Sequence, residues 1–93
     1  MKNLVKVSYL IFNDSPGYTN HCGDACLGES LATYDDFYTA KNACDKDKEC
    51  GCFDVNYRIS SPFKTHYGFL IEKMNDTARL SAWVKIYPYF LFV

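Results

Sequence analysis

Three cysteines gather in the segment TAKNACDKDKECGCFDV, residues 39–55, where the last two are separated by a single glycine. Cys44, Cys50 and Cys52 could serve as metal ligands, as a reactive thiol centre or as disulfide partners, because all three uses draw on the same sulfur atoms. Cys22 and Cys26 complete a set of five cysteines. A chain of 93 residues forms at most one domain, whose core leaves a small margin over conformational entropy, so cross-links would help it fold.

A zinc ion is the first alternative to a disulfide framework. Its donors would come from Cys22, Cys26, Cys50 and Cys52, with His21 or His66 available as an imidazole ligand. The spacing argues against this use, because C-x-x-x-C and C-x-C differ from the C-x-x-C pairs that commonly present two sulfurs to one tetrahedral ion. We therefore expect disulfides, with one of the five cysteines left over, and no metal or other cofactor.

Other chemistries find little support in the residue types. A cysteine nucleophile needs a base within hydrogen-bond reach, and the two histidines by themselves do not indicate such a pair, so we expect no enzyme. Ten basic against eleven acidic residues give a net charge of -1 with no basic block, which argues against nucleic acid as a partner. No stretch approaches the length of apolar sequence that crosses a bilayer, so we also expect no membrane span.

The hydrophobic pattern predicts one helix. In FYTAKNACDKDK, residues 37–48, Phe37, Ala40 and Cys44 fall on one face at three- and four-residue steps, and Asp35 or Asp36 can cap the amino end. Cys44 is therefore expected to face the core. The preceding residues 13–30 are rich in Asn, Asp, Gly, Ser and Pro and carry no period, which predicts a loop fixed by its two cysteines.

Alternating apolar residues predict the strands. They cover residues 5–12 (VKVSYLIF), 52–59 (CFDVNYRI), 67–74 (YGFLIEKM) and 81–90 (SAWVKIYPYF), with turns at residues 60–65 and 75–80. In the second of these strands, Phe53, Val55, Tyr57 and Ile59 share one face, and we expect the first three to pack on Phe37 and Ala40. The fold class is α+β, with one helix on a mostly antiparallel sheet of about five strands in a single domain, residues 1–93.

Several of these segments together resemble the PAN/apple family. The resemblance rests on YDDFYTAKNACDKDKECGCFDVNY, on YGFLIEK and on AWVKIYP, and it covers roughly residues 30–87. It implies a five-stranded antiparallel sheet around one helix, with a disulfide from the helix to the adjacent central strand. That bond would join Cys44 to Cys50 here, and both positions are compatible with it. Cys52 would then pair with Cys22 or Cys26.

The resemblance also implies a function. PAN/apple-like domains mediate extracellular contacts, so we expect a secreted, non-catalytic recognition or adhesion module that binds a protein or a glycan. Such a chain would be part of a longer precursor or would have lost its signal peptide, and Asn75 in Asn75-Asp76-Thr77 is a possible glycosylation site. The alternative is a structural protomer of a filament, coat or matrix, which associates with its own copies through YPYFLFV, residues 87–93. The same segment could instead form a buried strand beside residues 5–12.

Overall fold

The computed structural model describes residues 17–86. The strand predicted for residues 5–12 and the segment YPYFLFV lie outside the described residues. The elements in chain order are β1 (Gly17–Cys22), β2 (Ala25–Cys26), β3 (Ser30–Tyr34), α2 (Phe37–Lys46), β4 (Cys50–Asn56), β5 (Phe63–Tyr67), β6 (Ile71–Glu72) and β7 (Leu80–Ile86).

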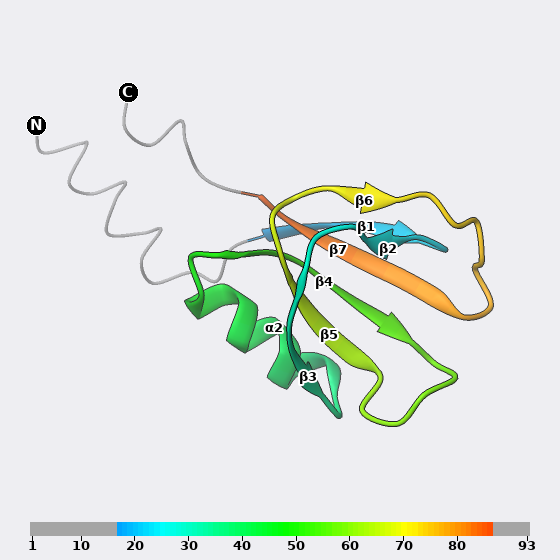
Figure 1. Ribbon diagram of the computed structural model, residues 1–93, viewed down its shortest axis with the longest axis horizontal. Helices are drawn as coiled ribbons and strands as arrows, with labels where there is room; N and C mark the ends of the chain where they lie inside the picture. The colour runs from blue at the N-terminus through cyan, green and yellow to red at the C-terminus, as the bar shows by residue number, and fades with distance from the viewer. Residues whose placement is uncertain (1–16, 87–93) are drawn as a thin grey trace, which may run out of the picture.

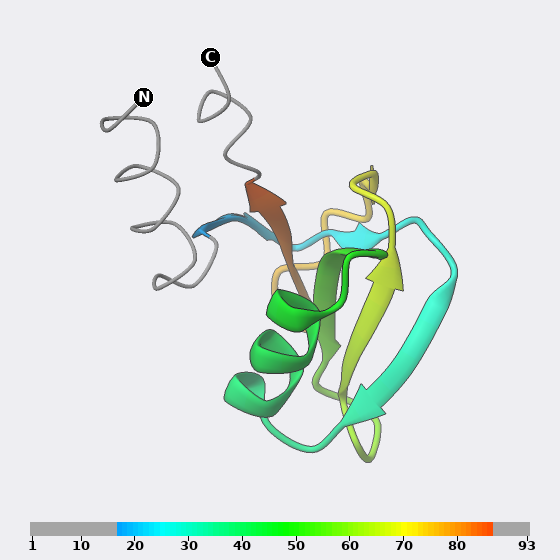
Figure 2. The ribbon, with the colours of Figure 1, turned by 90° about the vertical axis from the view of Figure 1, so that its left-hand side faces the viewer.

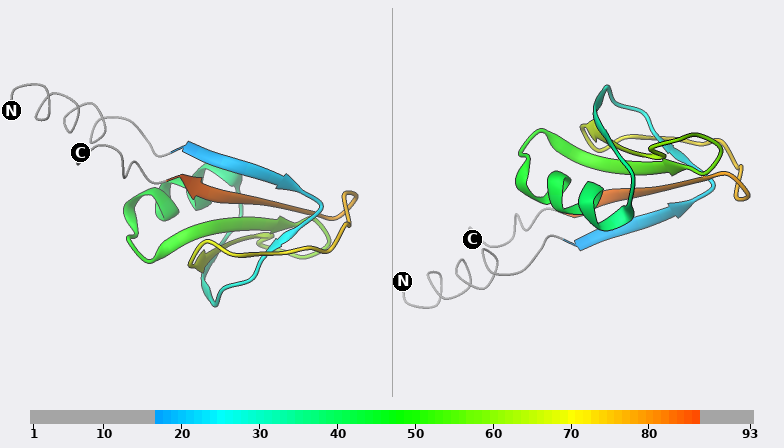
Figure 3. Two further views of the ribbon diagram at one scale, coloured as in Figure 1. Left: turned by 90° about the horizontal axis from the view of Figure 1, so that it is seen from above. Right: turned by 90° about the horizontal axis from the view of Figure 1, so that it is seen from below.

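The described residues form an α+β domain in three layers (Figure 1). Five strands make an antiparallel sheet in the order β1-β7-β4-β5-β3, and β2 pairs with β6 in a separate antiparallel ribbon. Helix α2 lies on one face of the sheet and the ribbon lies on the other, as the views from above and below show (Figure 3). This arrangement confirms the predicted fold class.

Strand β4 is the centre of the domain because both of its faces are covered. Phe53 points to the helix layer and is fully buried, with its ring centroid 5.3 Å from that of Phe37 and 5.1 Å from that of Trp83. Ala40 and Cys44 of the helix join the same apolar cluster. On the opposite face, Cys52 packs with Cys26 and Ala82 under the ribbon. Figure 2, in which the left-hand side of Figure 1 faces the viewer, shows the helix in front of the sheet.

A bulge near the start of β4 turns its two cysteines to opposite faces. Cys50 lies opposite Tyr67 and Cys52 opposite the adjacent residue His66, so one extra residue enters β4 between them. A Cβ atom at Gly51 would lie 2.3 Å from the carbonyl oxygen of Gly68, which only glycine avoids. Residues two positions apart in a regular strand would point the same way, so a prediction from strand alternation alone places Cys50 and Cys52 on one face, and it is wrong because the bulge breaks the two-residue period.

The two disulfides follow from this arrangement. Cys50 bonds to Cys44 of the helix, with 5.1 Å between their α-carbons, in the pairing that the family resemblance implied. Cys52 bonds to Cys26 of the ribbon, with 6.0 Å between the α-carbons. Cys22 is the cysteine left over, and it is exposed at the end of β1.

Helix α2 has a partner at each end. At the amino end, Asp36, one of the two predicted caps, accepts hydrogen bonds with its side chain from the backbone N–H of Thr39 at 3.1 Å and from the Thr39 hydroxyl at 2.6 Å. At the carboxyl end, the Lys85 ammonium donates to the carbonyl oxygens of Cys44 and Asp47. Burial is the main influence on the Lys85 side chain and lowers its pKa, while Asp45 and Asp47 act in the opposite direction.

Four predicted segments differ in the structure. Residues 13–30 were expected to be a loop, but Gly17–Cys22 pairs with β7 along the edge of the sheet, and Ala25–Cys26 and Ser30–Tyr34 are also strands. Tyr57 and Ile59 are 62% and 42% exposed because β4 ends at Asn56. The expected turn at residues 60–65 and strand at residues 67–74 are displaced, since Phe63–Tyr67 already forms β5. Among residues 17–86, no helix is long and apolar enough to cross a membrane.

The packing of β4 leads to a prediction about stability. Phe53→Ala should lower the free energy of unfolding by about 3 kcal/mol or more, because the other side chains of the cluster cannot fill the cavity. Tyr57→Ala, on the same strand face by sequence but exposed, is the matched control and should change it by less than about 0.5 kcal/mol. Urea unfolding measures both values, and equal losses would contradict the register described here.

Candidate functional site

The ribbon formed by residues 25–27 and 70–72 is the part of the domain with the clearest division into an inner and an outer face. Ala25 lies opposite Glu72 and Cys26 opposite Ile71, and the backbone N–H of Leu27 continues the pairing to the carbonyl oxygen of Leu70 at 2.9 Å. Cys26 and Ile71 face the sheet, where they pack with Cys52, Ala82 and Val84. Strand alternation therefore directs Leu27 and Leu70 outward.

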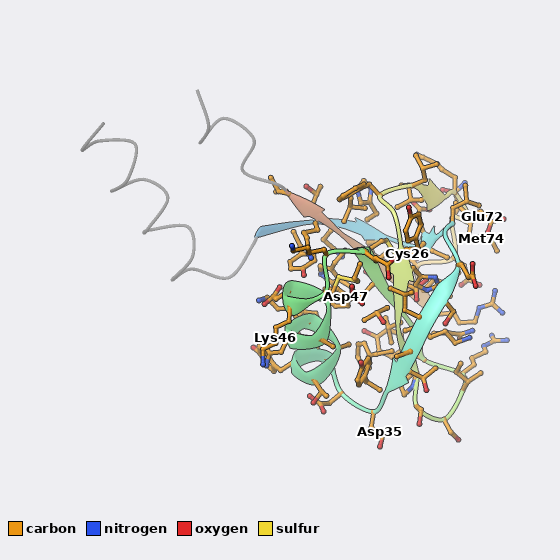
Figure 4. All side chains as sticks on the ribbon, turned by 60° about the vertical axis from the view of Figure 1, so that its left-hand side comes forward. Cys26, Asp35, Lys46, Asp47, Glu72 and Met74 are labelled. Carbon is orange, nitrogen blue, oxygen red and sulfur yellow. A yellow bond between two sulfur atoms is a disulfide. The ribbon has the colours of Figure 1, made fainter. Side chains whose placement is uncertain are left out.

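The outer face of the ribbon presents two exposed leucines, with Glu72 on the same face. Leu27 and Leu70 are 54% and 68% exposed, although they stand opposite each other as a cross-strand pair. Phe69 and Met74, which lie near the ribbon in the sequence, are each 43% exposed. Figure 4 shows Glu72 and Met74 on the side of the molecule away from the helix residues Lys46 and Asp47. Single exposed apolar residues are ordinary on protein surfaces, but two leucines that face each other across a ribbon and are both exposed form a surface suited to a contact.

Polar contacts hold the ribbon and the following residues to the sheet. The Asp54 carboxylate on β4 accepts a hydrogen bond from the backbone N–H of Cys26 through Oδ2 at 2.9 Å. Its other oxygen, Oδ1, lies 2.9 Å from Nε2 of His66 on β5. Nδ1 of His66 lies 2.8 Å from the carbonyl oxygen of Gly28. These contacts and the Cys26–Cys52 disulfide attach residues 26–28 to strands β4 and β5 of the sheet.

Gly28 is required for this close approach. A Cβ atom at this position would lie 1.7 Å from the carbonyl oxygen of Tyr67, so no other residue fits without a shift of the backbone. The absence of a side chain lets the segment after the ribbon lie directly on β5. The carbonyl oxygen of Gly28 is thereby brought within hydrogen-bond distance of His66.

His66 must be protonated to make both of its hydrogen bonds. A carbonyl oxygen and a carboxylate both accept, so each ring nitrogen has to donate, and only the imidazolium form carries two N–H groups. Burial is the largest influence on the His66 pKa and acts to lower it. The hydrogen bond and charge of Asp54, together with the Gly28 carbonyl, outweigh burial and the repulsion from Lys64, and the pKa is raised above 6.5.

A second carboxylate positions the chain after the ribbon. Asp24 is buried, and its Oδ1 accepts hydrogen bonds from the backbone N–H groups of Met74 and Asn75 at 3.1 and 3.4 Å. Asn75 has a φ of 55°, a left-handed conformation that asparagine tolerates, and it is exposed. The residue predicted as a glycosylation site is thus on the surface.

The structure separates the residues proposed for the zinc alternative. Cys50 and Cys52 belong to different disulfides on opposite faces of the sheet, so they cannot join Cys22 and Cys26 around one ion. Sequence reasoning missed a different group of possible metal donors, consisting of Cys26, Asp54 and His66. Their donor atoms lie within 4.8 Å of one another; Cys26 and His66 are buried, and the Asp54 side chain is 13% exposed. In the oxidised protein the Cys26 sulfur is part of a disulfide, so it is not available as a thiolate.

Comparison with protein-family models, with curated proteins and with solved structures finds no match for this chain. The resemblance to the PAN/apple family therefore stays a prediction.

The two disulfides should differ in their contribution to stability. Loop-closure entropy depends on the sequence separation, which is 26 residues for Cys26–Cys52 and 6 for Cys44–Cys50. Cys26→Ala/Cys52→Ala should therefore cost about 3.5 kcal/mol of unfolding free energy, and Cys44→Ala/Cys50→Ala about 2 kcal/mol. Urea unfolding of both double variants, each with Cys22→Ser, tests this order, and the reverse order would refute it.

The His66 contacts predict a dependence of stability on pH. Since the folded pKa is raised above the unfolded value near 6.5, the stabilisation is complete below that pH and is lost as the pH rises through the folded pKa. The free energy of unfolding of the oxidised protein should fall over this interval. His66→Asn should remove this fall, whereas His21→Asn, which changes the other histidine, should retain it. A pH profile that His66→Asn leaves unchanged would contradict the assignment.

Proposed function

We propose that this domain is a non-catalytic extracellular recognition module whose contact surface for a protein partner includes the outer face of the ribbon. The observation that carries the proposal is the cross-strand pair of Leu27 and Leu70, which is exposed although the ribbon beneath it is firmly anchored. A preorganised apolar surface loses little conformational entropy on binding, which favours its use in recognition.

The disulfides support the extracellular part of the proposal. Two disulfides in a domain of this size are typical of small secreted proteins, in which cross-links supplement a limited core. The chemistry of the outer face favours a protein over a glycan as the partner, since its central pair is aliphatic and has no hydrogen-bonding side-chain group. A glycan ligand is a separate outcome of the test.

The test uses a photo-crosslinking amino acid at position 70 of the full chain. We expect it to capture a protein partner from an extracellular extract, and an excess of unlabelled protein should suppress the capture. Leu27→Ser/Leu70→Ser should weaken binding of that partner by about tenfold or more, because central interface residues each contribute more than about 1 kcal/mol. Tyr38→Ser, on the exposed side of the helix, is the matched control and should bind normally.

The other outcomes separate the alternatives. Crosslinks to a second copy of the chain would favour the structural protomer, and a positive glycan array without protein capture would favour a carbohydrate ligand. A partner that binds Leu27→Ser/Leu70→Ser as tightly as the unchanged protein would refute the assignment to this surface. Unchanged melting temperatures of the variants must accompany these results, so that loss of binding is not loss of fold.

A further inference from the structure

We propose that reduction of the Cys26–Cys52 disulfide converts the anchor of the ribbon into a binding site for one thiophilic divalent cation such as Zn²⁺. The ligands are the two cysteine sulfurs, Nε2 of His66 and Oδ1 of Asp54. This set of two thiolates, one imidazole and one carboxylate consists of donors that zinc prefers. The inference concerns the reduced chain and does not depend on the proposed recognition function.

Three of the four donors already lie close together, and the fourth is bonded to one of them. Cys26, Asp54 and His66 have donor atoms within 4.8 Å of one another, and Cys52 is joined directly to the Cys26 sulfur. Two ligands of one zinc ion are about 3.3 to 3.8 Å apart, given zinc bonds of about 2.0 to 2.3 Å. Once the disulfide is open, the two sulfurs must separate from 2.05 Å to the ligand spacing, while the donor atoms of Cys26, Asp54 and His66 need to approach one another by about an ångström at most.

The surrounding hydrogen bonds are those that metal ligands need. His66 donates Nδ1–H to the carbonyl oxygen of Gly28 at 2.8 Å, which leaves Nε2 as the atom directed toward Asp54. Asp54 accepts the backbone N–H of Cys26 with Oδ2 at 2.9 Å, which leaves Oδ1 as its donor. Such outer contacts orient ligands and strengthen metal binding, and here they exist before any ion enters.

Burial gives the reduced state a reason to take up an ion. Cys26, Cys52 and His66 are at most 8% exposed, so opening the disulfide leaves two thiols and a charged pair in the interior. A cation would replace the lost covalent link between the ribbon and β4. The second disulfide lies on the other face of the sheet, so its cysteines cannot reach this site.

The reaction balances with a dithiol as the reductant. Two electrons and two protons pass to the Cys26–Cys52 bond, which gives two thiols, while the dithiol becomes a disulfide. Binding of the cation then releases both thiol protons and the Nε2 proton of the His66 imidazolium to solvent. The affinity should therefore rise with pH.

Cobalt(II) titration of the reduced full chain tests the proposal, because thiolate-bound cobalt absorbs light and zinc displaces it. All proteins carry Cys22→Ser, which removes the exposed free thiol. We expect one cobalt ion per chain in the reduced protein and none with thiolate ligation in the oxidised protein. His66→Asn should weaken binding by at least about tenfold. His21→Asn is the matched control and should leave the affinity unchanged.

Paired cysteine variants identify the thiolates. Cys26→Ser/Cys52→Ser should abolish the thiolate absorption, whereas Cys44→Ser/Cys50→Ser should retain it. If reduction unfolds the chain, His21 and His66 become equivalent ligands, so equal losses from the two histidine variants would overturn the proposal. A reduced protein that binds no cobalt, or binds it without regard to His66, would overturn it as well.

Discussion

Strand β4 is held covalently from both of its faces, and the rest of the domain depends on this constraint. Cys50 fixes the helix on one side and Cys52 fixes the ribbon on the other, although only Gly51 separates them. Residues two positions apart in a regular strand share one face, so the bulge at Gly51 is what allows the two cysteines to bond on opposite faces. A small domain thereby gains two covered faces from a single central strand.

The ribbon shows why the anchors matter for function. Each of its strands has two residues, and a pair of strands this short is not stable in water by itself. The Cys26–Cys52 bond, the Asp54 contact to the Cys26 backbone and the His66 contact to Gly28 supply the missing stabilisation. The outward direction of the apolar pair on the ribbon is consequently set by groups buried beneath it, one covalent and two polar.

Local patterns predicted the elements whose residues face a single apolar layer. The helix and the inward Cys44 followed from three- and four-residue spacing and Phe53 from strand alternation, while the cap was predicted at Asp35 or Asp36 and lies at Asp36. Strand β1 could not be predicted, because an edge strand such as GYTNHC is largely exposed and shows no apolar period. The contact between Asp54 and His66 joins neighbouring strands through the bulged register, and no spacing along the sequence indicates it.

The double anchoring of β4 can be tested most directly by mapping the disulfides through partial reduction and stepwise alkylation with two labels. We expect Cys22 to react before any reduction, and Cys44 to share its label with Cys50 wherever only one bond has opened. Cys26 and Cys52 should carry the other label together. Mass spectra in which Cys52 shares a label with Cys44 or with Cys22 would contradict the account, because β4 would then not be tied to the helix and the ribbon from opposite faces.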